Sequence, residues 1–266
     1  MPRSAALRAL RRREDRPPGH LTRRRISLGD GAETTVHVAE YDASRTLVRV
    51  VPLRGPAPLE AWCAKEGETE ALVGGFYVRA PDGRPGLPLG ELRTHGVRHR
   101  AVGFDAPWDA VRSCVSVVGG RARLAARSDL PAHPRGDLLQ AGPMLVRGER
   151  RVVRSGCNPE GFSAGSRQFD SDITAGRHPR AALAVAGERL LAIACDGRAR
   201  DEAGLTLVEL ADVLVDLGAR TAINLDGGGS TSLVCGGRLR NAPRAAHGVQ
   251  IPGGRAVSTA LVFRRA

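Results

Sequence analysis

The stretch TLVELADVLVDLGARTAINLDGGGSTSLVC, residues 206–235, holds the elements that decide the fold. Its first part, Leu207–Leu217, carries apolar residues at helical spacing. Thr206 and Glu209 stand at the two positions of a capping box, and Gly218 follows the last apolar residue. This pattern predicts an amphipathic helix that begins after Thr206 and packs on a core.

Strands surround that helix along the chain. The run 221–225 predicts a buried strand and 231–235 a further one, with Asp226 and three consecutive glycines between them. Upstream, 181–185 and 190–195 barely alternate between apolar and polar residues, which predicts a hairpin buried on both faces. Strands outnumber helices, so we expect an α+β fold with few helices and a large mixed β-sheet as its core.

Weaker patterns extend this prediction to both sides. The Val- and Thr-rich segments 34–41 and 46–53 predict a hairpin, and 256–263 predicts a last strand. The segments 81–110 and 155–177 are rich in glycine and polar residues, and we expect long loops there. Other short elements are expected at 58–66 (a helix) and at 71–78, 100–104, 115–118, 138–141 and 144–146 (strands).

Composition and charge limit the class of protein. The 266 residues carry a formal net charge of +12, but nine of the arginines precede residue 26. We therefore expect 1–30 to be a disordered Arg-rich leader and 31–266 to be one domain, with no nucleic-acid partner. Aromatic residues make up only 3%, too few for base-stacking platforms. The leader lacks an apolar signal segment, and no run of about 20 apolar residues could span a membrane, so we expect a soluble cytoplasmic protein.

The glycine-rich loop is the first candidate site. Three consecutive glycines let the backbone take positive φ and aim successive N–H groups into one concavity, which suits an anion. Asp226 stands at the edge of this loop, where a simple turn would need only one glycine. The expected anion-binding residues are Gly227, Gly228, Gly229, Ser230 and Thr231.

A second acid, Asp196, follows the predicted strand 190–195 in the same way that Asp226 follows 221–225. Paired carboxylates suit glycoside hydrolysis, one as acid or base and the other as nucleophile or stabiliser of the cationic transition state. An anionic substrate beside them needs cations, and Arg180 and Arg198 lie close by in the sequence. The sequence leaves open which acid takes which role.

These residues fall in blocks that resemble the phosphodiester glycosidase family in order and spacing. The resemblance extends over roughly 70–263, with Val73 where the family usually has Asn. It implies a hydrolase that releases a sugar from an anomeric phosphodiester without a cofactor. The blocks are His178-Pro179-Arg180-Ala181-Ala182, Asp196-Gly197-Arg198, Gly204-Leu205-Thr206, Asn224 through Ser230, Gly74-Gly75-Phe76-Tyr77 and Ala141-Gly142-Pro143-Met144-Leu145-Val146.

The resemblance also implies roles for single residues. Asp226 is expected as base or nucleophile and Asp196 as stabiliser of the cationic sugar, or the reverse, with Asn224 beside them. Arg180 and Arg198 are expected to hold the phosphate together with the glycine loop. A wall of the sugar pocket is expected from Gly75 and Phe76, and Arg255 also fits the family pattern before the last strand.

Two other functions remain open from the sequence: a metal-assisted phosphodiesterase that breaks the P–O bond, and a sugar-phosphate-binding protein without activity. Other residues give weaker motifs. His95 and His99 have a spacing that would suit zinc on a helix, but Gly96 disfavours a helix there. Asp170 and Asp172 lack the rest of a calcium loop. No Gly-x-Ser-x-Gly motif surrounds any serine, and the five cysteines include no Cys-x-x-Cys pair.

Overall fold

The computed structural model describes residues 19–79, 85–157, 159–162, 174 and 176–266. Within these residues the strands form sheets of seven, five and five strands and a two-stranded ribbon. Neighbouring strands run antiparallel throughout. The α+β class is confirmed, but the strands are divided among several antiparallel sheets instead of one large mixed sheet. No helix in these ranges is both long and apolar enough to cross a membrane.

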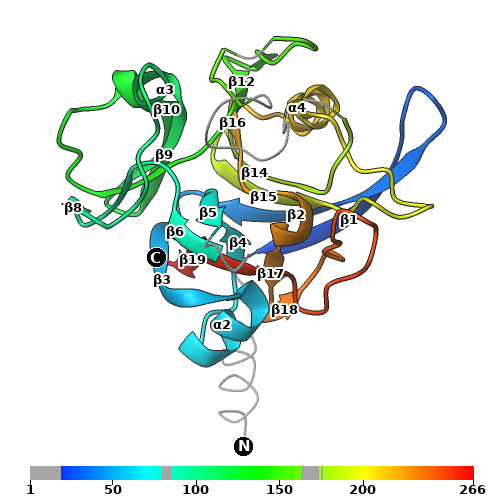
Figure 1. Cartoon of the computed structure of the whole chain (residues 1–266), viewed down its shortest axis with the longest axis horizontal. Coiled ribbons are helices and arrows are strands. Elements are labelled where there is room, and N and C mark those ends of the chain that lie inside the picture. Colours follow the sequence, from blue (N-terminus) through cyan, green and yellow to red (C-terminus); the bar gives the residue numbers. More distant parts are fainter. Residues whose placement is uncertain (1–18, 80–84, 158, 163–173, 175) are drawn as a thin grey trace, which may run out of the picture.

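The seven-stranded sheet carries the helix predicted from residues 206–218 (Figure 1). Helix α4, Leu207–Asp216, begins at Thr206 with both bonds of the capping box, and its apolar stripe packs on the sheet. The predicted hairpin 181–185/190–195 is confirmed as β14 and β15, joined through Gly187 at φ 64°. In order across the sheet the strands are β1 (His20–Ser27), β2 (Glu33–Asp42), β15 (Arg189–Cys195), β14 (Arg180–Ala186), β16 (Thr221–Asn224), β12 (Met144–Arg147) and β13 (Arg150–Arg151).

The two five-stranded sheets lie on other sides of the core. The first has the strand order β18 (Arg238–Leu239), β17 (Leu233–Cys235), β4 (Ala71–Val73), β19 (Ala256–Arg265) and β3 (Thr46–Pro58). Helix α2 (Leu59–Glu66) follows β3 in the chain. The second follows the order β10 (Arg121–Ala126), β9 (Ser113–Val118), β11 (Asp137–Gln140), β7 (Leu92–Thr94) and β8 (Val97–Arg98). The remaining elements are the ribbon β5 (Tyr77–Arg79) and β6 (Pro85–Pro88), helix α3 (Trp108–Val111), and 3₁₀ turns at Arg127–Asp129 and Gly228–Ser230.

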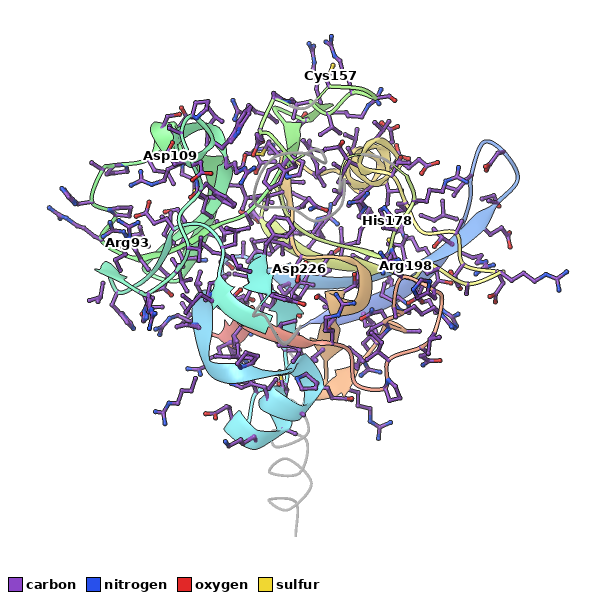
Figure 2. The ribbon with its side chains drawn as sticks, in the orientation of Figure 1. Arg93, Asp109, Cys157, His178, Arg198 and Asp226 are labelled. Carbon is purple, nitrogen blue, oxygen red and sulfur yellow. The ribbon has the colours of Figure 1, made fainter. Side chains whose placement is uncertain are left out.

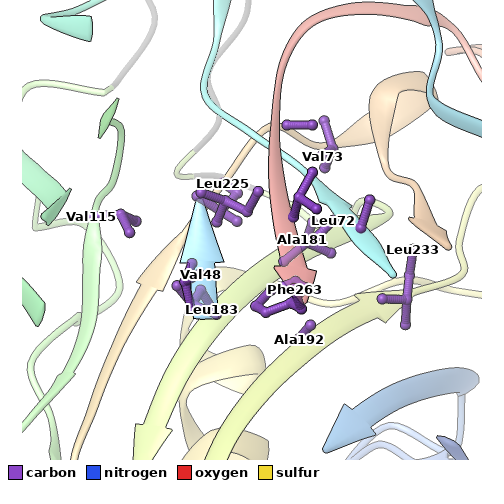
Figure 3. Packing of buried hydrophobic residues seen from close by; sticks show 14 of the residues in the cluster. Val48, Leu72, Val73, Val115, Ala181, Leu183, Ala192, Leu225, Leu233 and Phe263 are labelled. Carbon is purple, nitrogen blue, oxygen red and sulfur yellow. The ribbon is translucent and has the colours of Figure 1, made fainter. Parts of the chain in front are cut away.

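The core explains why β14 and β15 hardly alternate in sequence. Side chains on a strand point alternately to opposite faces of the sheet. Ala181 and Leu183 contribute to a core shared with the other two sheets, whereas Ala182 and Ala184 contribute to the core under α4. Figure 3 shows part of the shared core, where Leu183 lies near Phe263 of β19. Both faces of the hairpin are therefore buried, as the sequence predicted.

Two local predictions are wrong. The strands at 34–41 and 46–53 exist, but β2 pairs with β1 and β15 while β3 pairs with β19. Both edges of β2 are thus occupied, so β3 is directed into a different sheet. The segment 100–104 forms only a single bridge, Leu89 to Val102, instead of a strand.

The ordered fold also begins before residue 31. Strand β1 lies inside the predicted leader, where its exposed arginines are tolerated because it is an edge strand. Arg25 of this strand is held by Glu33 and Glu202. The rest of the predicted leader, 1–18, lies outside the described residues.

Candidate active site

The glycine loop is where the chain passes from β16 in the seven-stranded sheet to β17 in a five-stranded sheet. A Cβ on any of the three glycines would meet a neighbour at about the limit of contact. On Gly227 it would lie 2.9 Å from the carbonyl oxygen of Pro179. On Gly228 it would lie 3.0 Å from the Arg198 guanidinium, and on Gly229 3.0 Å from that of Arg255. Gly227 is thus required by the backbone that packs against it, whereas a side chain at Gly228 or Gly229 would displace the ends of the side chains that cover the loop.

The backbone of this loop does not form the predicted anion nest. Only Gly228 has a positive φ among the three glycines, at 60°, whereas a nest needs a sequence of alternating conformations. The N–H of Gly228 donates to Pro179 O (2.8 Å), and that of Gly227 donates to Asp226 Oδ1 (2.9 Å). Ser230 and Thr231 donate back into the 3₁₀ turn. An anion at this loop would therefore have to be bound mainly by side chains.

Asp226 meets the second family block at the start of the loop. Its N–H donates to Gly74 O (3.0 Å), and its half-buried carboxylate accepts from the N–H of Gly227. The N–H of Gly75 donates to Thr259 Oγ1 at 3.0 Å. The fold thus brings Asp226 and the Gly74-Gly75 segment together from opposite ends of the family's motif region. Figure 2 shows Asp226 near the centre of the molecule.

Two guanidinium groups lie against the glycine loop. Arg198, in the left-handed region at φ 61°, faces Gly228, and Arg255 faces Gly229. Among the described residues neither has a carboxylate within ion-pair distance; Arg198 Nη1 instead donates to Arg244 O (3.2 Å). Burial, and then the neighbouring charge of Arg255, lower the pKa of Arg198. Two adjacent cations without an acid are stabilised by an anion that binds between them.

The other predicted cation and acid have protein partners. Arg180 is buried, and its guanidinium donates to Leu205 O (3.0 Å) and Gly176 O (3.3 Å). Asp196 is also buried: Oδ1 accepts from the N–H of Ala242 (2.6 Å), and Oδ2 lies 2.8 Å from His37 Nε2. Both oxygens of the Asp196 carboxylate are thus engaged by protein groups, and the roles of the two acids stay predictions.

The remaining candidates are buried beside the loop. Asn224 Nδ2 donates to Gly142 O (3.0 Å) and Leu225 O (2.9 Å), while its Oδ1 has no partner in the described ranges. Ser230 and Thr231 are buried, at 1% and 0% exposure, so their hydroxyls face the interior. Phe76 lies in an aromatic cluster, 5.5 Å from Phe162 between ring centroids. Asn224, Ser230 and Thr231 thus support the loop from inside.

Other titratable residues are used elsewhere. His95 Nε2 lies 2.5 Å from an Arg49 nitrogen, and His99 Nε2 lies 2.6 Å from Thr94 Oγ1. The described residues contain no group of three or more His, Cys, Asp or Glu placed to hold a metal ion. Asp170 and Asp172 lie outside the described residues. All five cysteines are free, and only Cys157 is exposed.

A family model described as phosphodiester glycosidase matches residues 67–264, which is most of the chain. The chain belongs to the phosphodiester glycosidase family. A comparison with curated proteins gave no significant match.

Two solved structures show the same fold. The catalytic domain of zebrafish N-acetylglucosamine-1-phosphodiester alpha-N-acetylglucosaminidase, auto-inhibited by its pro-peptide, is similar with a TM-score of 0.68 and 18% identity, over 93% of this chain and 83% of that one. A hypothetical protein from Synechocystis is similar with a TM-score of 0.62 and 18% identity, over 91% of this chain. The chain spans 61% of that protein's length. Such identities show the shared fold.

The departure from the phosphodiester glycosidase pattern at Val73 has a structural setting. Val73 is fully buried in β4, next to Ala260 of β19, and its N–H donates to Ser232 O (2.9 Å). Figure 3 shows its side chain in the shared core. A branched apolar residue fits this place without the hydrogen-bond partner that an Asn would need.

Sequence reasoning missed two buried titratable residues of this family member. One is His37, which lies between Val36 and Val38 on a buried strand. A single polar residue in that apolar run was the only signal for it in the sequence. The other is Glu160, whose carboxylate accepts from Met144 N (2.7 Å) and Ser113 N (2.8 Å) under the Gly142-Pro143 turn. Burial raises the pKa of Glu160.

The buried Arg112 near Glu160 was also missed. Its guanidinium lies 3.8 Å from the ring centre of Phe104 and 4.2 Å from that of Phe162, and it donates to Glu160 O (2.8 Å). Such a cation between two aromatic faces is stabilised by their π-systems. The segment 159–162 is therefore fixed against the aromatic cluster that contains Phe76.

Proposed function

We propose that the chain is a hydrolase that cleaves the glycosidic C–O bond of a sugar 1-phosphodiester. The observation that carries the proposal is the pair of guanidiniums, Arg198 and Arg255, which lie against Gly228 and Gly229 two and three residues after Asp226. In this arrangement the two guanidiniums would hold a phosphate by its negative charge, and the Asp226 carboxylate would act on the atoms next to that phosphate. The family of the chain supports the same reaction class.

The chemistry requires little beyond these groups. Water adds its oxygen to the anomeric carbon while the bond from that carbon to the phosphate oxygen breaks, and the phosphomonoester leaves with the electron pair. A phosphomonoester has a second pKa of about 6, so it departs without strong help from a general acid. The two guanidiniums stabilise the charge that develops on it. Asp226 either takes the proton of the attacking water or attacks the anomeric carbon first.

The other residues support these groups in this proposal, and Asn224, Arg180 and the glycine loop take positioning parts where the sequence had predicted catalysis or phosphate binding. Gly75 and Phe76 line the sugar side, Asn224 and the loop from Gly227 to Thr231 hold Asp226, and Arg180 fixes the backbone around the site. The substrate is a small sugar phosphate, and the cytoplasmic location expected from the sequence belongs to the proposal. Cell fractionation followed by immunoblotting tests the location.

The reaction is tested by hydrolysis of a panel of sugar 1-phosphodiesters in water enriched in heavy oxygen, with and without a chelator. Wild type should place the label in the sugar, and Asp226→Asn should abolish turnover. Asp216→Asn, the same change on the exposed side of α4, is the matched control and should keep full activity. Label in the phosphate, lost on chelation, would indicate a metal-assisted phosphodiesterase. Binding without turnover would indicate a sugar-phosphate-binding protein.

A further inference from the structure

The segment 240–255 lies directly on the glycine loop, and we refer to it as the strap. The N–H of Arg255 donates to Gly229 O (2.9 Å), and Ile251 Cδ1 lies 2.9 Å from the point that a Cβ on Gly229 would occupy. The strap links β18 to β19 and forms only an isolated bridge, Arg244 to Gln250. Without a strand ladder of its own, it depends on individual contacts for its position.

Asp196 supplies one of these contacts. Its own backbone is held by β2: its N–H donates to Thr35 O (2.9 Å), and its carbonyl accepts from Thr34 Oγ1 (2.9 Å). Its Oδ1 accepts from the strap at Ala242 N (2.6 Å). Two residues further on, Arg198 Nη1 donates to the strap at Arg244 O (3.2 Å). The Asp196–Arg198 segment therefore joins the seven-stranded sheet to the strap.

His37 controls the orientation of that carboxylate. It lies on β2 with only 6% of its surface exposed, beside Ala194 of β15. Its Nε2 is 2.8 Å from Asp196 Oδ2, and since an ionised carboxylate only accepts, Nε2 carries the hydrogen. Without this donor, one buried carboxylate oxygen would lose its partner, and among the described residues the bond to Ala242 alone would hold the carboxylate against rotation about its Cβ–Cγ bond.

We propose that His37 is a positioning residue. Its imidazole fixes Asp196 so that the carboxylate anchors the strap on the glycine loop, and the strap in turn places Arg198 and Arg255 beside Gly228 and Gly229. The anion-binding geometry thus depends on a residue of β2 that does not itself contact the loop. The effect on catalysis rests on the proposed function, whereas the anchoring of the strap and the binding of phosphate do not.

Two amide substitutions separate this role from simple packing. In His37→Gln the side-chain amide nitrogen reaches about as far as Nε2 and can donate to Asp196, whereas in His37→Asn it is one methylene too short. Tyr41→Phe is the matched control, because it removes a bond from the same strand to another buried carboxylate, Glu70, at 2.9 Å. His37→Gln and Tyr41→Phe keep the size of the buried residue nearly constant, whereas His37→Asn is smaller, so recovery in His37→Gln is the comparison that isolates the donor.

The first measurement is amide hydrogen exchange across the whole chain, with no substrate present. We expect exchange in the strap, at Ala242 above all, to become roughly 10-fold to 100-fold faster in His37→Asn, the range for losing a bond to a charged group. His37→Gln should stay near wild type, and Tyr41→Phe should leave the strap protected. Equal protection of the strap in His37→Asn and wild type, or equal loss of protection over the whole chain, would overturn the proposal.

The second measurement is the stabilisation of each variant by inorganic phosphate in thermal unfolding. His37→Asn should need several-fold more phosphate than wild type for the same shift, and His37→Gln should restore the wild-type response. If phosphate stabilises both variants as it does wild type, the link from His37 to the arginines is wrong. On an active sugar 1-phosphodiester, the same loss should appear mainly in KM. If wild type turns over no substrate, the proposed function is contradicted. The hydrogen-exchange result then decides by itself whether His37 positions the strap.

Discussion

Replacing Arg255 by Met is expected to stabilise the fold and to weaken phosphate binding at the same time. Arg255 is half-buried against the glycine loop, has no carboxylate partner among the described residues, and its charge lowers the pKa of Arg198. Methionine keeps the apolar stem that covers the loop and removes the like charge. The variant therefore relieves repulsion in the unliganded protein.

The two effects differ in size. Charge pairs that remain partly in contact with water contribute about 0.2–1 kcal/mol, so the unliganded variant should gain no more than that. For a domain of this length, a gain of that order raises Tm by up to about 2–4 °C. A bond from a guanidinium to an anion contributes about 1.5–3 kcal/mol, so the Kd for phosphate should rise roughly 10-fold to 150-fold.

Differential scanning fluorimetry with increasing inorganic phosphate measures both effects in one experiment. Arg265→Met removes a charge from the exposed end of β19 and serves as the control, with little expected change in either quantity. A lower Tm in Arg255→Met without phosphate, together with unchanged phosphate affinity, would show that Arg255 has a structural role and would refute the anion site.

Two further predictions concern the framework around the site. Burial raises the pKa of Glu70, so the folded state holds the proton of this carboxyl more tightly than the unfolded state does. The stability of wild type should therefore fall as pH rises from the unfolded pKa through the raised one, and Glu70→Gln should remove this dependence in urea midpoints measured from low pH to neutrality. Gly227→Ala places a Cβ 2.9 Å from Pro179 O, which is backbone and cannot rotate away, and should destabilise by about 1–3 kcal/mol in chemical denaturation. Gly229→Ala meets only side-chain ends and should lose phosphate affinity with a smaller change in stability.

The parts of the fold with strong local signals could be predicted from the sequence. Helix α4 has its capping box, apolar stripe and terminal glycine within one short stretch, and the structure confirms it. The β14–β15 hairpin is confirmed for the same reason, since Gly187 and two apolar runs are local features. The pairing of β2 could not be predicted in this way, because its partner β15 is distant in sequence and no local pattern shows which strand edge β2 will pair with.

In the candidate site, too, local features could be predicted from the sequence and long-range contacts could not. Asp226, Arg198 and the three glycines were predicted as site residues from the family blocks, and the structure places Arg198 against Gly228, two residues after Asp226. The N–H groups of the predicted nest are used otherwise: Ser230 and Thr231 donate within the 3₁₀ turn, and Gly228 donates to Pro179 O from a different segment, which no local pattern could show. His37 gave no signal beyond its polarity on a buried strand, because its function comes from an Asp about 160 residues away and from tertiary packing.

Because the glycine loop passes from one sheet to another, the geometry of the site depends on the spacing between the two sheets. Asp226 follows a strand of the seven-stranded sheet, yet its N–H is tied to Gly74, which follows β4 of the neighbouring sheet. Any change in volume between the sheets, such as at Leu183 or Phe263, must therefore shift the carboxylate against the glycine pair. Engineering of the proposed activity thus begins in the aliphatic interior, where side-chain size affects the geometry of the candidate site.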